Sequence, residues 1–157
     1  QKEAEAVVLR MQQRFNEVKR KGALLPRRAR LYVEEWPALP AGSSGKHDPP
    51  FASGNWVPEV VRIAGGEPLP FQSGALSREV TLEEVSNFNP DLIVVSWCGA
   101  GSLAPKELLL KRQGWDELPA VCNRHVRVVD DSLLNRPGPR LIEGAQHLYG
   151  WMFEMLH

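Results

Sequence analysis

Few residues in this sequence have the types and the spacing that catalysis or metal binding requires. Cys122 and His125 have the Cys-x-x-His spacing of zinc ligands, but zinc needs three or four ligands, and His47 is only a loose further candidate. Residues 99–101 are a fragment of the dinucleotide-binding pattern Gly-x-Gly-x-x-Gly, which would need a glycine in place of Ala104. The sequence has neither a Gly-x-Ser-x-Gly elbow nor a Walker lysine. We therefore expect no enzyme and no intrinsic metal or cofactor.

Three tryptophans are better candidates for binding a ligand. Trp36, Trp56 and Trp97 could present broad apolar faces to a large planar molecule, at a low cost in conformational entropy. The alternative is ordinary core packing. We place Trp36 and Trp97 in a binding cleft ahead of Trp56.

Polar residues near the end of the chain could complete such a site. Ser132, Asn135 and Arg136 follow a predicted strand, and their side chains could hold amide or carboxylate groups of a ligand by hydrogen bonds. The alternative is that the preceding aspartates cap a turn and that Arg136 is a solvated surface residue.

Strand and helix patterns alternate along the chain, which predicts an α/β fold with a mainly parallel sheet covered on both faces. The continuous apolar run at residues 92–95 is typical of a strand buried on both sides. Thr81 and Glu84 have the spacing of a capping box. The predicted strands are 30–34, 92–95 and 126–129, and the predicted helices are 1–22, 56–64, 82–89, 105–111 and one from Pro139 onward.

Open parallel sheets hold ligands beyond the carboxyl ends of their strands. The three strand ends carry Glu35-Trp36, residues 96–99 and residues 130–132. Since two of the three ends include a tryptophan, we expect the binding site at this edge of the sheet.

The composition excludes other classes of protein. The chain of 157 residues has 19 Lys+Arg and 19 Asp+Glu, so its formal net charge is zero. A general nucleic-acid binder needs excess positive charge to displace counterions, and we expect no such partner. No apolar run is long enough to span a bilayer. Two cysteines, Cys98 and Cys122, are too few for a disulfide framework.

Four stretches in this order resemble the C-terminal lobe of the class III periplasmic binding proteins, above all the cobalamin-binding subgroup. The resemblance covers nearly the whole chain. It is carried by residues 32–36, by residues 48–51 with 56–59 and 64–66, by residues 89–91 with 96–99, and by residues 135–141.

The resemblance implies a Rossmann-like three-layer lobe at 23–157, preceded by an interlobe linker helix at 1–22, with the N-terminal lobe absent. It implies capture of cobalamin, an iron-siderophore or a haem-like ligand, in the periplasm or another extracytoplasmic space, and delivery to an ABC permease of the membrane. Glu59, with Glu67 as the second choice, is similar to the glutamates that dock this family on the permease; the alternative is a solvated glutamate.

Two further expectations follow. Residues 38–47 are inserted into a stretch that is nearly continuous in the family. The insertion is either a lid over the site or a tolerated surface loop. Because the lobe lacks its neighbour, its exposed apolar surface should favour homo-oligomers. The rival interpretations are an intracellular corrinoid- or haem-binding module that meets no permease, and a small Rossmann-like enzyme.

Overall fold

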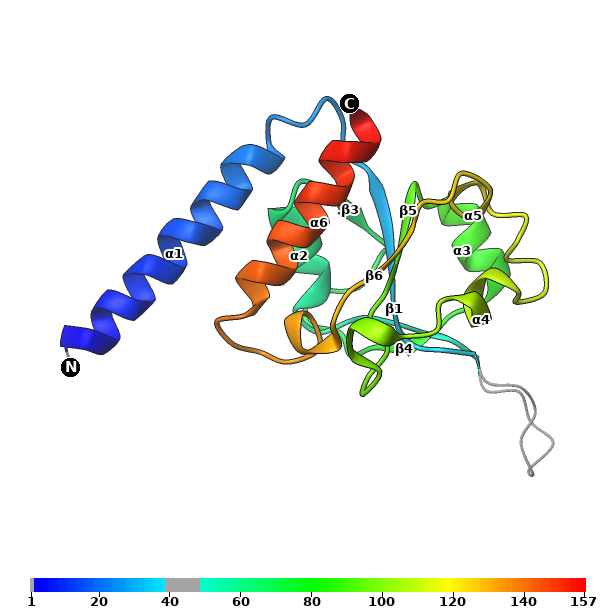
Figure 1. Cartoon of the computed structure of the whole chain (residues 1–157), viewed down its shortest axis with the longest axis horizontal. Helices are drawn as coiled ribbons and strands as arrows, with labels where there is room; N and C mark the ends of the chain where they lie inside the picture. The colour runs from blue at the N-terminus through cyan, green and yellow to red at the C-terminus, as the bar shows by residue number, and fades with distance from the viewer. Residues whose placement is uncertain (1, 39–48) are drawn as a thin grey trace.

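A computed structural model describes residues 2–38 and 49–157, which form an α/β lobe with helices on both faces of one sheet (Figure 1). Residues 39–47 of the predicted insertion, His47 among them, lie outside the described residues. The strands are β1 (Arg30–Trp36), β2 (Phe51–Ala52), β3 (Glu67–Pro68), β4 (Arg78–Glu79), β5 (Leu92–Val95) and β6 (Val126–Val128). The α-helices are α1 (Lys2–Gly22), α2 (Val57–Ile63), α3 (Leu82–Phe88), α4 (Glu107–Leu110), α5 (Pro119–Cys122) and α6 (Leu141–Leu156), with single 3-10 turns at η1 (Gly101–Leu103) and η2 (Asp131–Leu133).

The sheet has the strand order β4-β2-β1-β5-β6, and β3 pairs with the amino-terminal part of β1. β1, β3, β5 and β6 are parallel, whereas β2 and β4 are antiparallel to their neighbours. The predicted three-layer α/β fold with a mainly parallel sheet is confirmed. The carboxyl ends of β1, β5 and β6 therefore meet at one edge of the sheet.

The two layers of helices follow from the alternation of side chains along the strands. Leu92 and Val94 of β5 point into the core beneath α1, α2 and α6, while Ile93 and Val95 point into the core beneath α3, α4 and α5. All four residues are buried. A strand that is covered in this way has no polar face, which is why its sequence is a continuous apolar run.

A close contact between two glycines fastens α1 to the rest of the lobe. Gly22 ends α1 and lies against Gly65, which follows α2 and has a φ of +96°. A Cβ on Gly22 would lie 2.7 Å from backbone atoms of Ala64 and Gly65. Only glycine allows this approach without a clash, and Gly65 also tolerates the left-handed conformation. The contact joins the carboxyl ends of the two helices.

Two local predictions need correction in detail. The Thr81 hydroxyl accepts a hydrogen bond from the Glu84 amide at 3.1 Å, as in a capping box. The Glu84 carboxylate does not return to Thr81; it pairs with Arg78 of β4. This hydrogen bond to the arginine lowers the pKa of Glu84. The segment between the predicted strand 30–34 and the predicted helix 56–64 also contains β2, whose two residues are too few for a visible period-two pattern.

Candidate functional site

The carboxyl ends of β1, β5 and β6 form one surface, which we call the strand-end surface: residues 35–38, 96–101 and 130–136. Figure 1 shows the carboxyl end of β1 at the lower edge of the molecule, with the N-terminus of α1 also low in the view but far to the left. The predicted site residues Trp36, Ser132, Asn135 and Arg136 all belong to this surface.

Asn135 ties the loop after β6 to the end of β5. Its amide nitrogen donates to the Ser96 carbonyl at 2.6 Å and to the Cys98 sulfur at 3.2 Å. Its amide oxygen accepts a hydrogen bond from the Ser96 hydroxyl at 3.0 Å. Because these bonds use both ends of the amide, Asn135 acts mainly to hold the two loops together.

Asp131 strengthens the same connection. It is buried, and its two carboxylate oxygens accept hydrogen bonds from the backbone amides of Gly99 and Gly101, each at 3.1 Å. Both glycines have positive φ angles, 78° and 59°, so their amides can converge on one anion. Asp131 already occupies this small anion-binding turn, and the loop after β5 is fixed without a ligand.

Glu35 and Cys98 form a second polar group beside the first. The Cys98 thiol donates to Glu35 at 3.6 Å, and the Ser77 hydroxyl also donates to the Glu35 carboxylate. Burial raises the pKa of the Cys98 thiol above its ordinary value, and the Glu35 charge acts in the same direction. Cys98 is therefore a neutral thiol at pH 7.

Trp36 is the last residue of β1 and the large aromatic residue that the strand-end surface exposes. Its relative exposure is 49%. A solvent-exposed indole on the strand-end surface offers an apolar face to a ligand without any rearrangement of the core.

Trp97 belongs to the same segment, but its side chain is buried and is not exposed on the strand-end surface, which corrects the expectation from the sequence. It is only 3% exposed and packs with Tyr32 and Val95 beneath α3, α4 and α5. Its indole nitrogen donates to the Glu34 carboxylate at 3.0 Å. Trp97 is two residues after Val95, so strand alternation carries it to the same inner side.

Glu34 is the centre of a buried polar cluster directly below the strand-end surface. Its carboxylate accepts two hydrogen bonds from Arg112, at 2.7 and 2.9 Å, and one from the Tyr32 hydroxyl at 2.8 Å. Arg112 lies over the ring of Trp115. Burial, followed by the nearby Glu34 charge, raises the pKa of Tyr32 well above its ordinary value. The sequence analysis missed this cluster, because Arg112 is 78 residues from Glu34.

The remaining predicted ligand-binding residues, Trp56, Ser132 and Arg136, lie at the margin of the strand-end surface. Trp56 is half-buried just before α2, and its indole nitrogen donates to the Leu134 carbonyl at 2.7 Å. Ser132 donates to Asp130, and hydrogen bonds from Ser132 lower the pKa of that aspartate. Arg136 is exposed beside them.

The other predicted positions are away from the strand-end surface. Glu59 in α2 and Glu67 in β3 are exposed, and Glu59 lies 3.5 Å from Arg62. Cys122 donates to the Asp116 carbonyl at 3.2 Å. Within residues 2–38 and 49–157, no three His, Cys, Asp or Glu side chains gather as a metal site.

None of the helices in the described part of the chain has the length and apolarity needed to cross a bilayer.

Comparison with known proteins gives consistent results. The sequence profile of the periplasmic binding protein family matches residues 1–133. An uncharacterised ABC transporter substrate-binding lipoprotein of Bacillus subtilis is 41% identical over 70 residues, which are 45% of this chain and 21% of that protein. The vitamin B12-binding protein of Vibrio parahaemolyticus is 31% identical over 100 residues, 61% of this chain and 34% of that protein.

A solved structure shows the same fold. The ABC-type Fe3+-hydroxamate transport protein of Saccharomonospora viridis superposes with a TM-score of 0.77 at 23% identity, over 96% of this chain and 49% of that protein. This chain thus spans about half the length of that structure, and its matches cover 21% and 34% of the two curated relatives.

Proposed function

This chain belongs to the periplasmic binding protein family, a family of binding proteins rather than enzymes, and we propose that it is the C-terminal ligand-binding lobe of an ABC importer's capture protein. Residues 23–157 would form the lobe, and α1 would be the linker to an N-terminal lobe. The exposed indole of Trp36 on a strand-end surface held by Asn135 and Asp131 is the observation that carries the proposal. The protein would work outside the cytoplasm, a proposal that the name of one relative, a substrate-binding lipoprotein, supports.

A corrinoid such as cobalamin is the ligand that this surface suits best. Haem is usually held through iron by histidine, cysteine, methionine or tyrosine, and residues 35–38, 96–101 and 130–136 contain no histidine, tyrosine or methionine. Cys98, the cysteine of these segments, already donates to Glu35 and accepts from Asn135. A corrin ring carries its own cobalt ligands and many amide groups, which suits an indole face with polar neighbours such as Ser132 and Arg136.

Replacing Trp36 with alanine in the full-length, two-lobe protein should weaken vitamin B12 binding by about 1–3 kcal/mol, the scale of losing a large aromatic contact. This corresponds to roughly 5- to 150-fold in Kd. Because the indole is half exposed, the free energy of unfolding should change by less than about 0.5 kcal/mol. Titration calorimetry and chemical denaturation measure the two effects.

Phe153→Ala is the matched control, since Phe153 is an aromatic residue of similar exposure (45%) on α6. It should leave the affinity unchanged. If wild type and Trp36→Ala bound vitamin B12 with equal affinity, Trp36 would not be part of the binding site. Tight binding of a ferric hydroxamate or haem, without binding of vitamin B12, would contradict the corrinoid proposal itself.

Glu59 and Glu67 are proposed to dock the lobe on the permease. Both carboxylates are exposed, and exposed charges guide the orientation and rate of docking more than they add affinity. Reversing both charges to lysine should slow ligand uptake by proteoliposomes that contain the cognate permease, by about tenfold at low salt, with no change in ligand Kd. Glu107→Lys, on α4, is the control. Uptake at the wild-type rate would exclude docking through this pair. Absence of uptake with the wild-type protein itself would instead favour a binding module that meets no permease.

The N-terminal part of α1 is proposed to meet the other lobe. Val7, Val8 and Leu9 are exposed there, whereas Val18 nearer the other end is buried against the lobe. In the isolated chain these apolar residues leave a surface on which a second copy could pack.

A further inference from the structure

A basic pocket lies at the end of the lobe opposite to the strand-end surface. Its volume is about 340 Å³. The backbone contact between Gly22 and Gly65 forms part of its wall, where the absence of side chains leaves space. Four cationic side chains line it and no acidic one does: Lys19, Arg27, Arg28 and Arg62.

The nearby carboxylates neutralise these charges only in part. Arg27 is paired with Asp91 through two hydrogen bonds, at 2.9 and 3.1 Å. Arg62 has only an exposed contact of 3.5 Å with Glu59. The ion pairs found among residues 2–38 and 49–157 include neither Lys19 nor Arg28. The pocket therefore keeps a positive charge in a chain whose formal net charge is zero.

Helix electrostatics explain only part of this arrangement. Cations are favourable in the last turn of a helix, which accounts for Lys19 in α1 and Arg62 in α2. Arg27 and Arg28 lie in the connection between α1 and β1, where no helix end requires them. The α1–β1 connection thus adds two guanidinium groups to a pocket that already contains Lys19 from α1 and Arg62 from α2.

We propose that this pocket binds a phosphate group. A phosphate group, whether inorganic phosphate or the phosphodiester of a lipid headgroup, carries negative charge on non-bridging acceptor oxygens, and guanidinium groups match such oxygens with pairs of hydrogen bonds. The phosphate could belong to a soluble ion or to the headgroup of an anionic lipid. Both present the same chemistry to Lys19 and Arg28.

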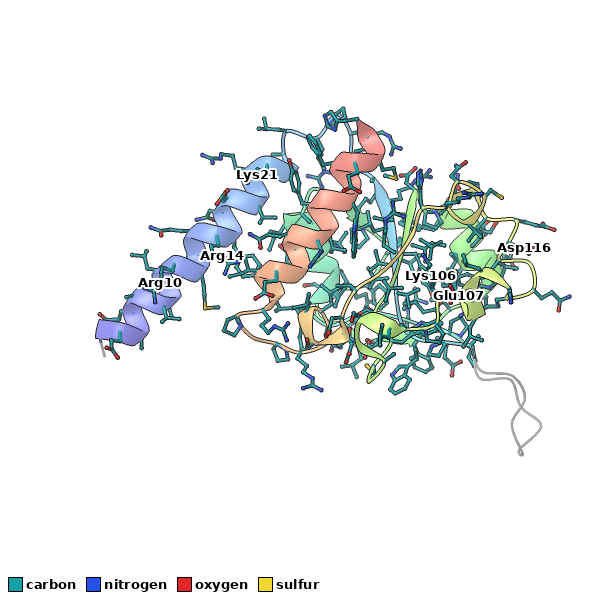
Figure 2. All side chains as sticks on the ribbon, in the orientation of Figure 1. Arg10, Arg14, Lys21, Lys106, Glu107 and Asp116 are labelled. Carbon is teal, nitrogen blue, oxygen red and sulfur yellow. The ribbon has the colours of Figure 1, made fainter. Side chains whose placement is uncertain are left out.

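The test uses the 157-residue chain and inorganic phosphate, followed by amide NMR signals. The Gly22 and Gly65 amides should shift and saturate as phosphate is added. Lys19→Gln with Arg28→Gln should weaken this binding about tenfold or more, because two charge-assisted contacts are lost. Lys106→Gln with Lys111→Gln removes the same charge from a distant segment and should leave the binding unchanged. Figure 2 shows Lys106 far from Lys21 at the end of α1. Circular dichroism checks that both variants are folded.

Vesicles separate the two sources of phosphate. A lipid headgroup is the source if phosphatidylglycerol vesicles sediment the wild type and the control variant but not the pocket variant. Phosphatidylcholine vesicles should then sediment none of the three proteins. Saturable phosphate shifts without sedimentation support a soluble ion. The proposal is overturned if no saturable shifts occur at Gly22 and Gly65, whatever the vesicles do. It is also overturned if the two double variants lose binding equally, since net charge alone would then explain the effect.

Discussion

Replacing Arg112 with methionine should destabilise the lobe by about 3–5 kcal/mol, the usual cost of removing one partner of a buried ion pair. Glu34 is completely buried, and Arg112 supplies two of its four hydrogen bonds. Without the guanidinium, the carboxylate would keep its charge in a site that water does not reach, or would have to take up a proton. Chemical denaturation in urea measures the loss.

Two comparisons make this prediction specific. Lys111→Met changes an exposed neighbour of Arg112 and should alter the free energy of unfolding by less than about 0.5 kcal/mol. The double variant Glu34→Leu with Arg112→Met replaces the whole pair with apolar side chains and should recover part of the stability. If Arg112→Met unfolded at the wild-type urea concentration, the ion pair would have no role in stability.

Replacing Trp97 with alanine should cost about 3–5 kcal/mol of stability, the range for a large aromatic residue in a core. The indole is 3% exposed and also donates to Glu34, so its loss opens a cavity and removes one hydrogen bond from the buried cluster. Trp36→Ala should show the opposite pattern, with weaker ligand binding at nearly unchanged stability. Urea denaturation and ligand titration of both variants distinguish the two tryptophans.

Trp97→Phe separates the two contributions of the indole. Phenylalanine keeps most of the ring in the core but cannot donate to Glu34, so the cost should fall to about 1–3 kcal/mol. If Trp97→Ala kept full stability and lost only ligand affinity, Trp97 would be a cleft residue. In that case α3, α4 and α5 would have to move away from the indole in solution.

The local pattern of the sequence determined the main elements of the fold. The apolar run at residues 92–95 forms β5, Thr81 begins α3 as its N-cap, and the apolar face of the last helix packs into the core through Leu148 and Met152. These features depend on residues a few positions apart, so periodicity and capping are sufficient to predict them. The three two-residue strands were not predicted, because two residues cannot show a period.

The place of the strand-end surface also followed from the sequence, because the carboxyl ends of parallel strands share one edge of a sheet. The direction in which each side chain points at this surface did not follow from the sequence. Trp36 and Trp97 both lie at a strand end, yet Trp36 is exposed and Trp97 is buried. Alternation from Ile93 and Val95 could have indicated the inward side for Trp97; that the strand keeps this alternation beyond Val95 is seen only in the fold.

Long-range partners were decided by the tertiary structure alone. Arg112 reaches Glu34 across 78 positions, and Lys19 meets Arg62 at one pocket because Gly22 packs against Gly65. A sequence shows that such charges exist and which elements carry them. Which charges meet, and whether water reaches them, depends on how the helices pack on the sheet, and this sets both the stability of a buried pair and the binding capacity of an exposed one.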